Sequence, residues 1–270
     1  MNHTSAISLA VAGIPSGRIL ELEGYPDGSD AVAYVSGSVV TPLANPWSDI
    51  DVFVLTERRP IGPLALDAGP SQTSQHFVDG RRIDFEFWPP GHVRSLGERL
   101  DRLRIGSADY APLCMFTYAE ECFIHRLRIG VPILRPDGIQ AVQRLFDFDK
   151  FGRYQAQEAI RQTDSIHEDV CGMLEAGHLD VAVLRARDLI GRSVDAYLHA
   201  RGQTDPVVKW RPRHVRLSDD GSEFHRYVAA TYWRLEFPTT LGPDAPAEAH
   251  RRYAEDCLAF SQRLISWIQS

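Results

Sequence analysis

Lysine is nearly absent from this chain of 270 residues, and so are several features that would point to particular classes of protein. Only Lys150 and Lys209 are lysines among the 29 basic residues, and the 36 acidic residues leave a net charge of −7. No global positive field attracts nucleic acid or an anionic membrane, so a small molecule is the expected partner. The hydrophobic content of 44% lies in the normal globular range, and a folded domain structure is predicted.

Cysteine is also scarce, and long hydrophobic runs are missing. The four cysteines, Cys114, Cys122, Cys171 and Cys257, form no CxxC pair and have no histidine at metal-binding spacing. We therefore expect free thiols and neither a zinc site nor a redox motif. The apolar stretch 7–14 is too short to span a bilayer, and no Lys or Arg precedes it. These absences favour a cytoplasmic protein without a membrane partner.

The residue pattern changes character near residue 90. Before it lie three runs typical of β-strands, at 31–36, 49–55 and 75–87, and the dipeptide Asp79-Gly80 predicts a hairpin turn within the third. After it, apolar residues recur at helical spacing. The expected helices cover 93–103, 113–127, 150–175, 179–200, 222–235 and 247–268. The pattern predicts a small head over residues 1–92 and a helical domain over residues 93–270.

The most informative segment follows the first expected strand. Gly37-Ser38 ends that strand, ten residues follow, and the next strand begins with Asp49-Ile50-Asp51. Side chains alternate between the faces of a strand, so Asp49 and Asp51 point the same way while Ile50 points into the core. Two solvated aspartates on an edge strand are the plain alternative. Because Asp is depleted in strands and like charges repel, a cation between the two carboxylates is the better interpretation.

Magnesium fits this pair of carboxylates best. It is a hard cation that binds carboxylate oxygens and keeps coordination positions for substrate phosphates. The pattern therefore predicts a magnesium site at Asp49 and Asp51.

The arrangement of strand, Gly37-Ser38, ten residues and Asp49-Ile50-Asp51 resembles the signature of the DNA polymerase β-like nucleotidyltransferase superfamily. Within it, the chain is similar to the small bacterial enzymes that nucleotidylate antibiotics. The resemblance implies an α+β fold, with a small mixed-sheet nucleotidyltransferase head followed by a helical C-terminal domain and the active site between them.

The family also has a third carboxylate on a later strand of the same sheet. The run 81–87 supplies Asp84 and Glu86 on one face. The resemblance favours Asp84 as the third metal ligand. Glu86 departs from the expected pattern, and three roles stay open for it: a second ligand, a general base or a solvated neighbour.

The resemblance implies transfer of a nucleoside monophosphate from a nucleoside triphosphate, with ATP as the expected donor, to a hydroxyl group of a small molecule. Two Mg²⁺ ions would be held by Asp49, Asp51 and Asp84, and pyrophosphate would leave. Gly37 would let the backbone approach the triphosphate, and Ser38 would donate to its oxygens. Two alternatives remain: a macromolecular acceptor such as tRNA or a protein, and a catalytically silent interaction module of the same fold.

A second, weaker similarity to antibiotic-type nucleotidyltransferases lies at 128–138. It predicts a helix that ends at Gly130, a short extended run and a turn at Asp137-Gly138. We interpret this segment as architecture rather than chemistry.

Three other features of the helical part remain open. The basic cluster 209–214 is either a solvated loop or a cationic edge that meets the triphosphate, and Lys209 is its candidate contact. The aromatic residues of 224–237 either fill the core or form a wall for a ring. The acidic segments 164–169 and 120–121 are expected to be charged outer faces of helices.

Overall fold

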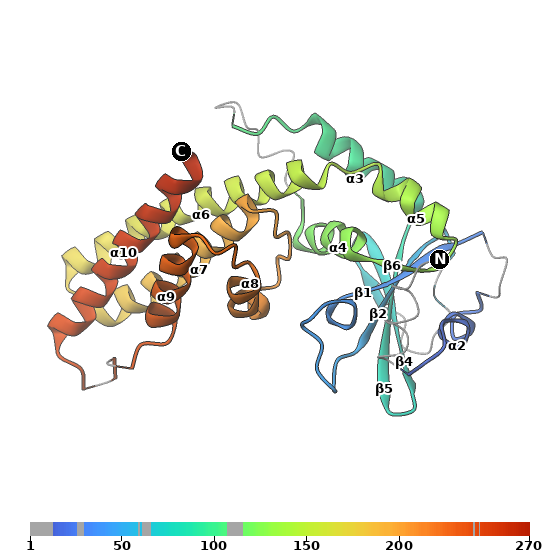
Figure 1. The fold of residues 1–270 in the computed structure, drawn as a ribbon, viewed down its shortest axis with the longest axis horizontal. Helices are drawn as coiled ribbons and strands as arrows, with labels where there is room; N and C mark the ends of the chain where they lie inside the picture. Colours follow the sequence, from blue (N-terminus) through green and yellow to red (C-terminus); the bar gives the residue numbers. More distant parts are fainter. Residues whose placement is uncertain are drawn as a thin grey trace. The chain divides into compact units, whose positions relative to one another are not determined.

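The computed structural model describes residues 13–25, 30–58, 60, 66–106, 116–239, 241–242 and 244–270. The described chain forms two compact units (Figure 1). The first contains the described residues up to Arg104 and those from 116 to Asp147, and the second contains mainly Phe148–Ser270. The predicted division after residue 92 does not coincide with this split, because helices and a strand beyond it pack on the sheet. Cys114 and the predicted helix start at Leu113 lie outside the described residues.

The first unit is built on one mixed sheet of six strands in the order β3-β4-β5-β2-β1-β6. The neighbours β2 and β5 are parallel, and the other pairs are antiparallel. This confirms the predicted mixed-sheet head. Its elements are α2 (Ser16–Glu21), β1 (Val32–Ser36), the 3-10 helix η1 (Ser38–Val40), β2 (Ile50–Leu55), β3 (Leu66–Ala68), β4 (Ser71–Val78), β5 (Arg81–Trp88), α3 (Pro90–Arg102), α4 (Tyr118–Ile129), β6 (Val131–Leu134) and α5 (Pro136–Gln143).

The two faces of the sheet differ in composition. On one face, alternate residues of β1, β2 and β5 are buried with Ile19 and Leu20 of α2 in an apolar core. On the other face, Phe123 of α4 packs on Phe53 and Trp88, with ring centroids 6.3 and 4.3 Å apart. Figure 1 shows α2 and α4 on opposite sides of the sheet. Asp51 of β2 and the acidic residues Asp84 and Glu86 of β5 alternate with the core residues and lie on the α4 face, so this face carries the candidate chemistry.

The Asp79-Gly80 turn joins β4 to β5 as predicted. Asp79 has φ 51° and Gly80 φ 77°, so both central residues are left-handed. A two-residue turn of this kind matches the twist of the flanking strands. The strand register therefore runs without a bulge from Val78 opposite Arg81 to Gln72 opposite Phe87.

The segment after α4 corrects one sequence prediction. The helix ends at Gly130 and the extended run forms β6, which pairs with β1 at the edge of the sheet. Asp137 and Gly138 do not form a turn but belong to the first turn of α5. Pro136 begins this helix because its fixed φ suits the first helical position.

The position of Glu120 corrects another sequence prediction. Its side chain is buried rather than on an outer face, and it accepts hydrogen bonds from the Thr117 N–H (2.7 Å) and from Arg99 Nη1 (2.8 Å). It thereby completes a capping box at the start of α4.

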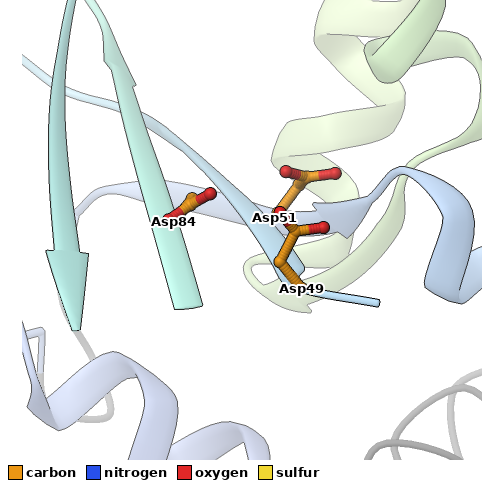
Figure 2. Close-up of side chains that lie close together, drawn as sticks. All are labelled: Asp49, Asp51 and Asp84. Atoms are coloured by element: carbon orange, nitrogen blue, oxygen red, sulfur yellow. The ribbon is translucent and has the colours of Figure 1, made fainter. Parts of the chain in front are cut away.

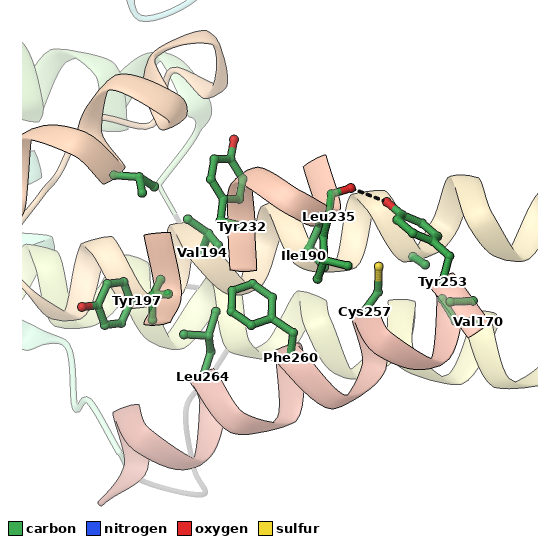
Figure 3. Packing of buried hydrophobic residues seen from close by; sticks show 14 of the residues in the cluster. Val170, Ile190, Val194, Tyr197, Tyr232, Leu235, Tyr253, Cys257, Phe260 and Leu264 are labelled. Atoms are coloured by element: carbon green, nitrogen blue, oxygen red, sulfur yellow. Dashed lines mark hydrogen bonds between the residues drawn. The ribbon is translucent and has the colours of Figure 1, made fainter. Parts of the chain in front are cut away.

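The second unit is a helical bundle with an apolar core. Figure 3 shows Tyr197, Phe260 and Leu264 within this core, and the Tyr253 hydroxyl donates to the Leu235 carbonyl at 2.7 Å. The aromatic group of 224–237 mostly packs against it, as the core interpretation predicts. The helices are α6 (Phe148–Ala176), α7 (Leu179–Ala200), η3 (Val208–Trp210), α8 (Arg211–Leu217), α9 (Glu223–Glu236) and α10 (Ala247–Gln269). In the described part of the chain, none of the helices has the length and apolar character needed to cross a membrane.

Candidate metal centre

Three carboxylates meet on the α4 face of the sheet. Asp51 on β2 lies directly opposite Asp84 on the parallel strand β5, and Asp49 precedes β2 by one residue. One oxygen from each lies within 4.8 Å of the others. Figure 2 shows the three side chains pointing into the same space. The parallel pairing of β2 and β5 therefore brings together the aspartates that the sequence singled out.

The electrostatics of this cluster favour a bound cation. The pKa of Asp51 is raised to about 6, chiefly by burial and also by Asp49 and Asp84, against the opposing effect of Arg126. Burial also raises the pKa of Asp84. Asp84 Oδ1 is buried and has no hydrogen-bond partner among the described residues. A divalent cation would both offset the repulsion and satisfy this oxygen, so the residues present fit Mg²⁺.

Two arginines contact the triad, and sequence reasoning missed both. Arg82 bonds to Asp49, and its Nε lies 3.1 Å from Asp84 Oδ2. Arg126 of α4 approaches Asp51 with Nη1 3.5 Å from Oδ2. The alternation of β5 placed Arg82 on the same face as Asp84 and so offered a signal. Arg126 offered none, because its position depends on how α4 packs on the sheet.

Gly37 occupies a place where a side chain does not fit. Its φ is 80°, and an added Cβ would overlap Asp51 Oδ2 and lie 2.6 Å from Arg126 Nη1. Ser38 follows as the first residue of η1. The buried backbone at Gly37 therefore passes close to Asp51 and Arg126, where a side chain would not fit, and its contact with a triphosphate stays a prediction.

Glu86 lies two residues beyond Asp84 on the same face. It pairs across the sheet with Phe53 and accepts a hydrogen bond from Trp88 Nε1 at 2.8 Å. The pKa of Glu86 is raised to about 7, chiefly by burial, with the bond from Trp88 lowering it and the charge of Asp51 raising it. These contacts argue against the solvated alternative for Glu86 and leave the ligand and general-base roles open.

The basic cluster of 209–214 belongs to the helical unit. It forms η3 and the start of α8 instead of a loop. Arg211 is paired with Asp195 through two bonds of 2.6 and 2.7 Å, and His214 lies 3.0 Å from Asp205. Lys209 is exposed, with its ammonium 5.1 Å from the ring centroid of Trp210. Its contact with a triphosphate stays a prediction.

The sequence comparisons agree with this geometry. Residues 20–96 match the family described as the nucleotidyltransferase domain. Residues 20–96 are a nucleotidyltransferase domain. The match spans Gly37, Ser38 and all three aspartates, so the predicted family and enzyme class are confirmed for this nucleotidyltransferase. The triad fits metal-dependent nucleotidyl transfer.

Two further comparisons add no functional detail. No curated protein sequence matches the chain. Among solved structures, a nucleotidyltransferase-like protein from Exiguobacterium sibiricum is similar at 13% identity and a TM-score of 0.48, over 96% of this chain and 74% of that one. A likeness at this level carries no information about substrate.

Proposed function

We propose that this nucleotidyltransferase moves a nucleoside monophosphate from a nucleoside triphosphate, ATP in the first instance, to a hydroxyl group of a small molecule. The observation that carries the proposal is the convergence of Asp49, Asp51 and Asp84 within 4.8 Å on one face of the sheet. In the reaction, the acceptor oxygen forms a bond to the α-phosphorus and the bond to the β-phosphate oxygen breaks. Pyrophosphate leaves, and the acceptor loses its hydroxyl proton.

Asp49, Asp51 and Asp84 would hold Mg²⁺, and two ions are expected. When bound, the metal neutralises phosphate charge and lowers the pKa of the attacking hydroxyl. The aspartates themselves orient the site, because β2 and β5 hold Asp51 and Asp84 in register. A rigid sheet keeps carboxylates in position better than a loop does.

The Gly37-Ser38 loop and Arg126 are suited to hold the triphosphate. The loop presents backbone beside Arg126 Nη1, and Ser38 adds a hydroxyl donor. A guanidinium can donate two hydrogen bonds to phosphate oxygens in a fixed geometry. Lys209 of the helical unit is proposed as a further contact.

Glu86 is proposed to take the acceptor's proton, directly or through a water molecule. It shares the face of Asp84 and stands one strand step further along, about 7 Å away at the usual rise. The hydrogen bond that Trp88 Nε1 donates engages Oε1 of Glu86. Such a role contributes about 10² to 10⁴ in rate.

Mass spectrometry of candidate acceptors, after incubation with mixed nucleoside triphosphates and Mg²⁺, tests the proposal. A mass gain names the nucleotide and the acceptor together. Thermal unfolding provides the companion test, since a competent site is stabilised more by Mg²⁺ and ATP together than by the two separate effects combined. A protein that shows neither coupling nor transfer is the silent module instead.

A further inference from the structure

Two exposed aromatic side chains lie beside the triad. Trp47 is 94% exposed and Phe77 66% exposed, the highest values among the large hydrophobic residues of the described chain. Both line one hollow of about 460 Å³, together with Asp49, Arg81 and Arg82. Exposed apolar groups gathered at a hollow are a mark of a binding site. Here the hollow includes Asp49 itself, so it adjoins the metal centre.

The backbone under Trp47 is well held although its ring is in solvent. Asn45 Oδ1 accepts from the Trp47 N–H at 2.8 Å, and the Asn45 N–H donates to Ser48 Oγ at 3.0 Å. Arg81 Nη1 lies 3.4 Å from the Ser48 carbonyl. The turn therefore presents the ring without burying it, and a ligand could cover it at little cost in backbone order.

Phe77 extends the same face. It pairs with Arg82 across β4 and β5, while the next pair on this face joins Gln75 to Asp84. Across the sheet, the neighbouring strands β4, β5, β2 and β1 therefore place Phe77, Asp84, Asp51 and the Gly37 loop side by side in that order. The carboxylates stand between the hollow and the loop that is proposed to hold the triphosphate.

This order suits an acceptor in the hollow. In phosphoryl-type transfer, the attacking and leaving oxygens lie roughly in line on opposite sides of the phosphorus. If the pyrophosphate leaves on the side of Gly37, the hydroxyl enters from the side of Trp47 and Phe77.

The charges of the hollow define the class of acceptor. Asp79 is paired with Arg18 at 3.0 Å, and Asp49 with Arg82. Arg81 and Arg82 both line the hollow, and a cation held by Asp49 and Asp84 would compete with Arg82 for these carboxylates and so release its guanidinium for a ligand. Two arginines beside two exposed rings suit a planar ring with an anionic group.

We infer that Trp47, Phe77, Arg81 and Arg82 form an acceptor subsite for a small hydroxylated molecule that carries a planar ring and a phosphate or carboxylate. The inference rests on the proposed function and deepens it. The size of the hollow and the net charge of −7 favour a small molecule over a nucleic-acid strand.

Calorimetric titration of the full chain tests the subsite, with AMP as the probe in the presence of Mg²⁺ and saturating α,β-methylene-ATP. This analogue occupies the donor position and cannot be cleaved at the α-phosphorus. Trp47→Ala should weaken AMP binding about tenfold, the usual effect of losing a stacked ring, and Trp47→Phe should restore most of it. Arg81→Gln should weaken binding of AMP but leave that of neutral adenosine unchanged.

Tyr118→Ala is the matched control, because Tyr118 is 61% exposed on α4 of the same unit and does not line the hollow. It should bind AMP like the parent protein. AMP affinity that is unchanged in Trp47→Ala overturns the inference. The inference is also overturned if the protein binds the polycation kanamycin, or a decameric oligoadenylate, more tightly than AMP and this binding depends on Trp47.

Two outcomes separate this inference from its premise. If Trp47→Ala weakens binding of the ATP analogue and spares AMP, the hollow holds the donor base and the acceptor assignment is wrong. If the parent protein shows Trp47-dependent AMP binding but no Mg²⁺-dependent binding of the analogue, the proposed transfer fails while the ring subsite stands.

Discussion

Two aspartates, one in each unit, meet their cations differently. In the helical unit, Asp195 is bound through both oxygens to Arg211 at 2.6 and 2.7 Å. In the sheet unit, Asp51 lies 3.5 Å from Arg126, its one ion-pair partner among the described residues, and faces two other carboxylates. The first arrangement is complete without a ligand, whereas the second still lacks positive charge. This contrast separates carboxylates that stabilise the fold from those that await a cation.

The largest expected effect comes from the incomplete cluster. Asp49→Asn or Asp51→Asn should lower the transfer rate by about 10³-fold or more, because metal stabilisation supplies several kcal/mol of the barrier reduction. Steady-state transfer assays measure this loss. Asp30→Asn, an exposed aspartate of the same unit, is the control and should retain activity. Near-parental transfer by either triad variant would remove the metal assignment.

The same variants should keep or gain stability without metal. Burial raises the pKa of Asp51 from 3.8 to about 6, so the folded state binds the extra proton and loses stability as the pH rises through this window. Asp51→Asn should therefore exceed the parent in free energy of unfolding by about 3 kcal/mol well above pH 6 and approach it near pH 3.5. Denaturant unfolding in EDTA at several pH values measures the difference.

The two carboxylates of β5 should differ in kind. Asp84→Asn should lose activity at every pH, because it removes a direct ligand. Glu86→Gln should keep Mg²⁺-dependent nucleotide binding but lose about 10² to 10⁴ in rate and flatten the pH profile. Rate measurements from pH 5 to 9, with calorimetry of nucleotide binding, distinguish them. If Glu86→Gln eliminates metal-dependent binding and Asp84→Asn spares it, the two roles must be exchanged.

Asp195 is the carboxylate that we expect to stabilise the fold without taking part in transfer. Asp195→Asn should leave the largely buried guanidinium of Arg211 without its carboxylate and cost about 3 kcal/mol of stability. Transfer per folded molecule should change little. Thermal unfolding and an activity assay at low temperature measure both. A variant that lost activity at full stability would contradict the structural role of this pair.

The smallest effect is expected at Lys209. Lys209→Ala should weaken nucleotide binding and leave acceptor binding nearly unchanged, because a single exposed ammonium contributes modestly to phosphate affinity. Calorimetry with ATP and Mg²⁺ measures it. A general loss of stability without a change in affinity would assign Lys209 to the fold alone.

Local pattern was sufficient to predict much of the sheet unit. The alternation of β2 placed Asp49 and Asp51 together, and Asp79-Gly80 specified the hairpin that positions Asp84. Prediction failed where local preference competed with packing. Asp137-Gly138 has turn composition, but Pro136 and contacts with the sheet begin a helix there. Glu120 looked exposed, but its capping role buries it.

The sequence by itself determined the family, the three aspartates and a helical C-terminal part after a mixed sheet. These features depend on residue type and spacing over fewer than about 40 residues, where side-chain alternation and turn chemistry act directly. Only the tertiary structure decided that Asp51 pairs with Asp84, that Arg126 approaches Gly37, and that Trp47 and Phe77 line one hollow. Each of these joins residues of separate elements, and such contacts follow from the pairing of β2 with β5 and the packing of α4 on the sheet rather than from any local signal.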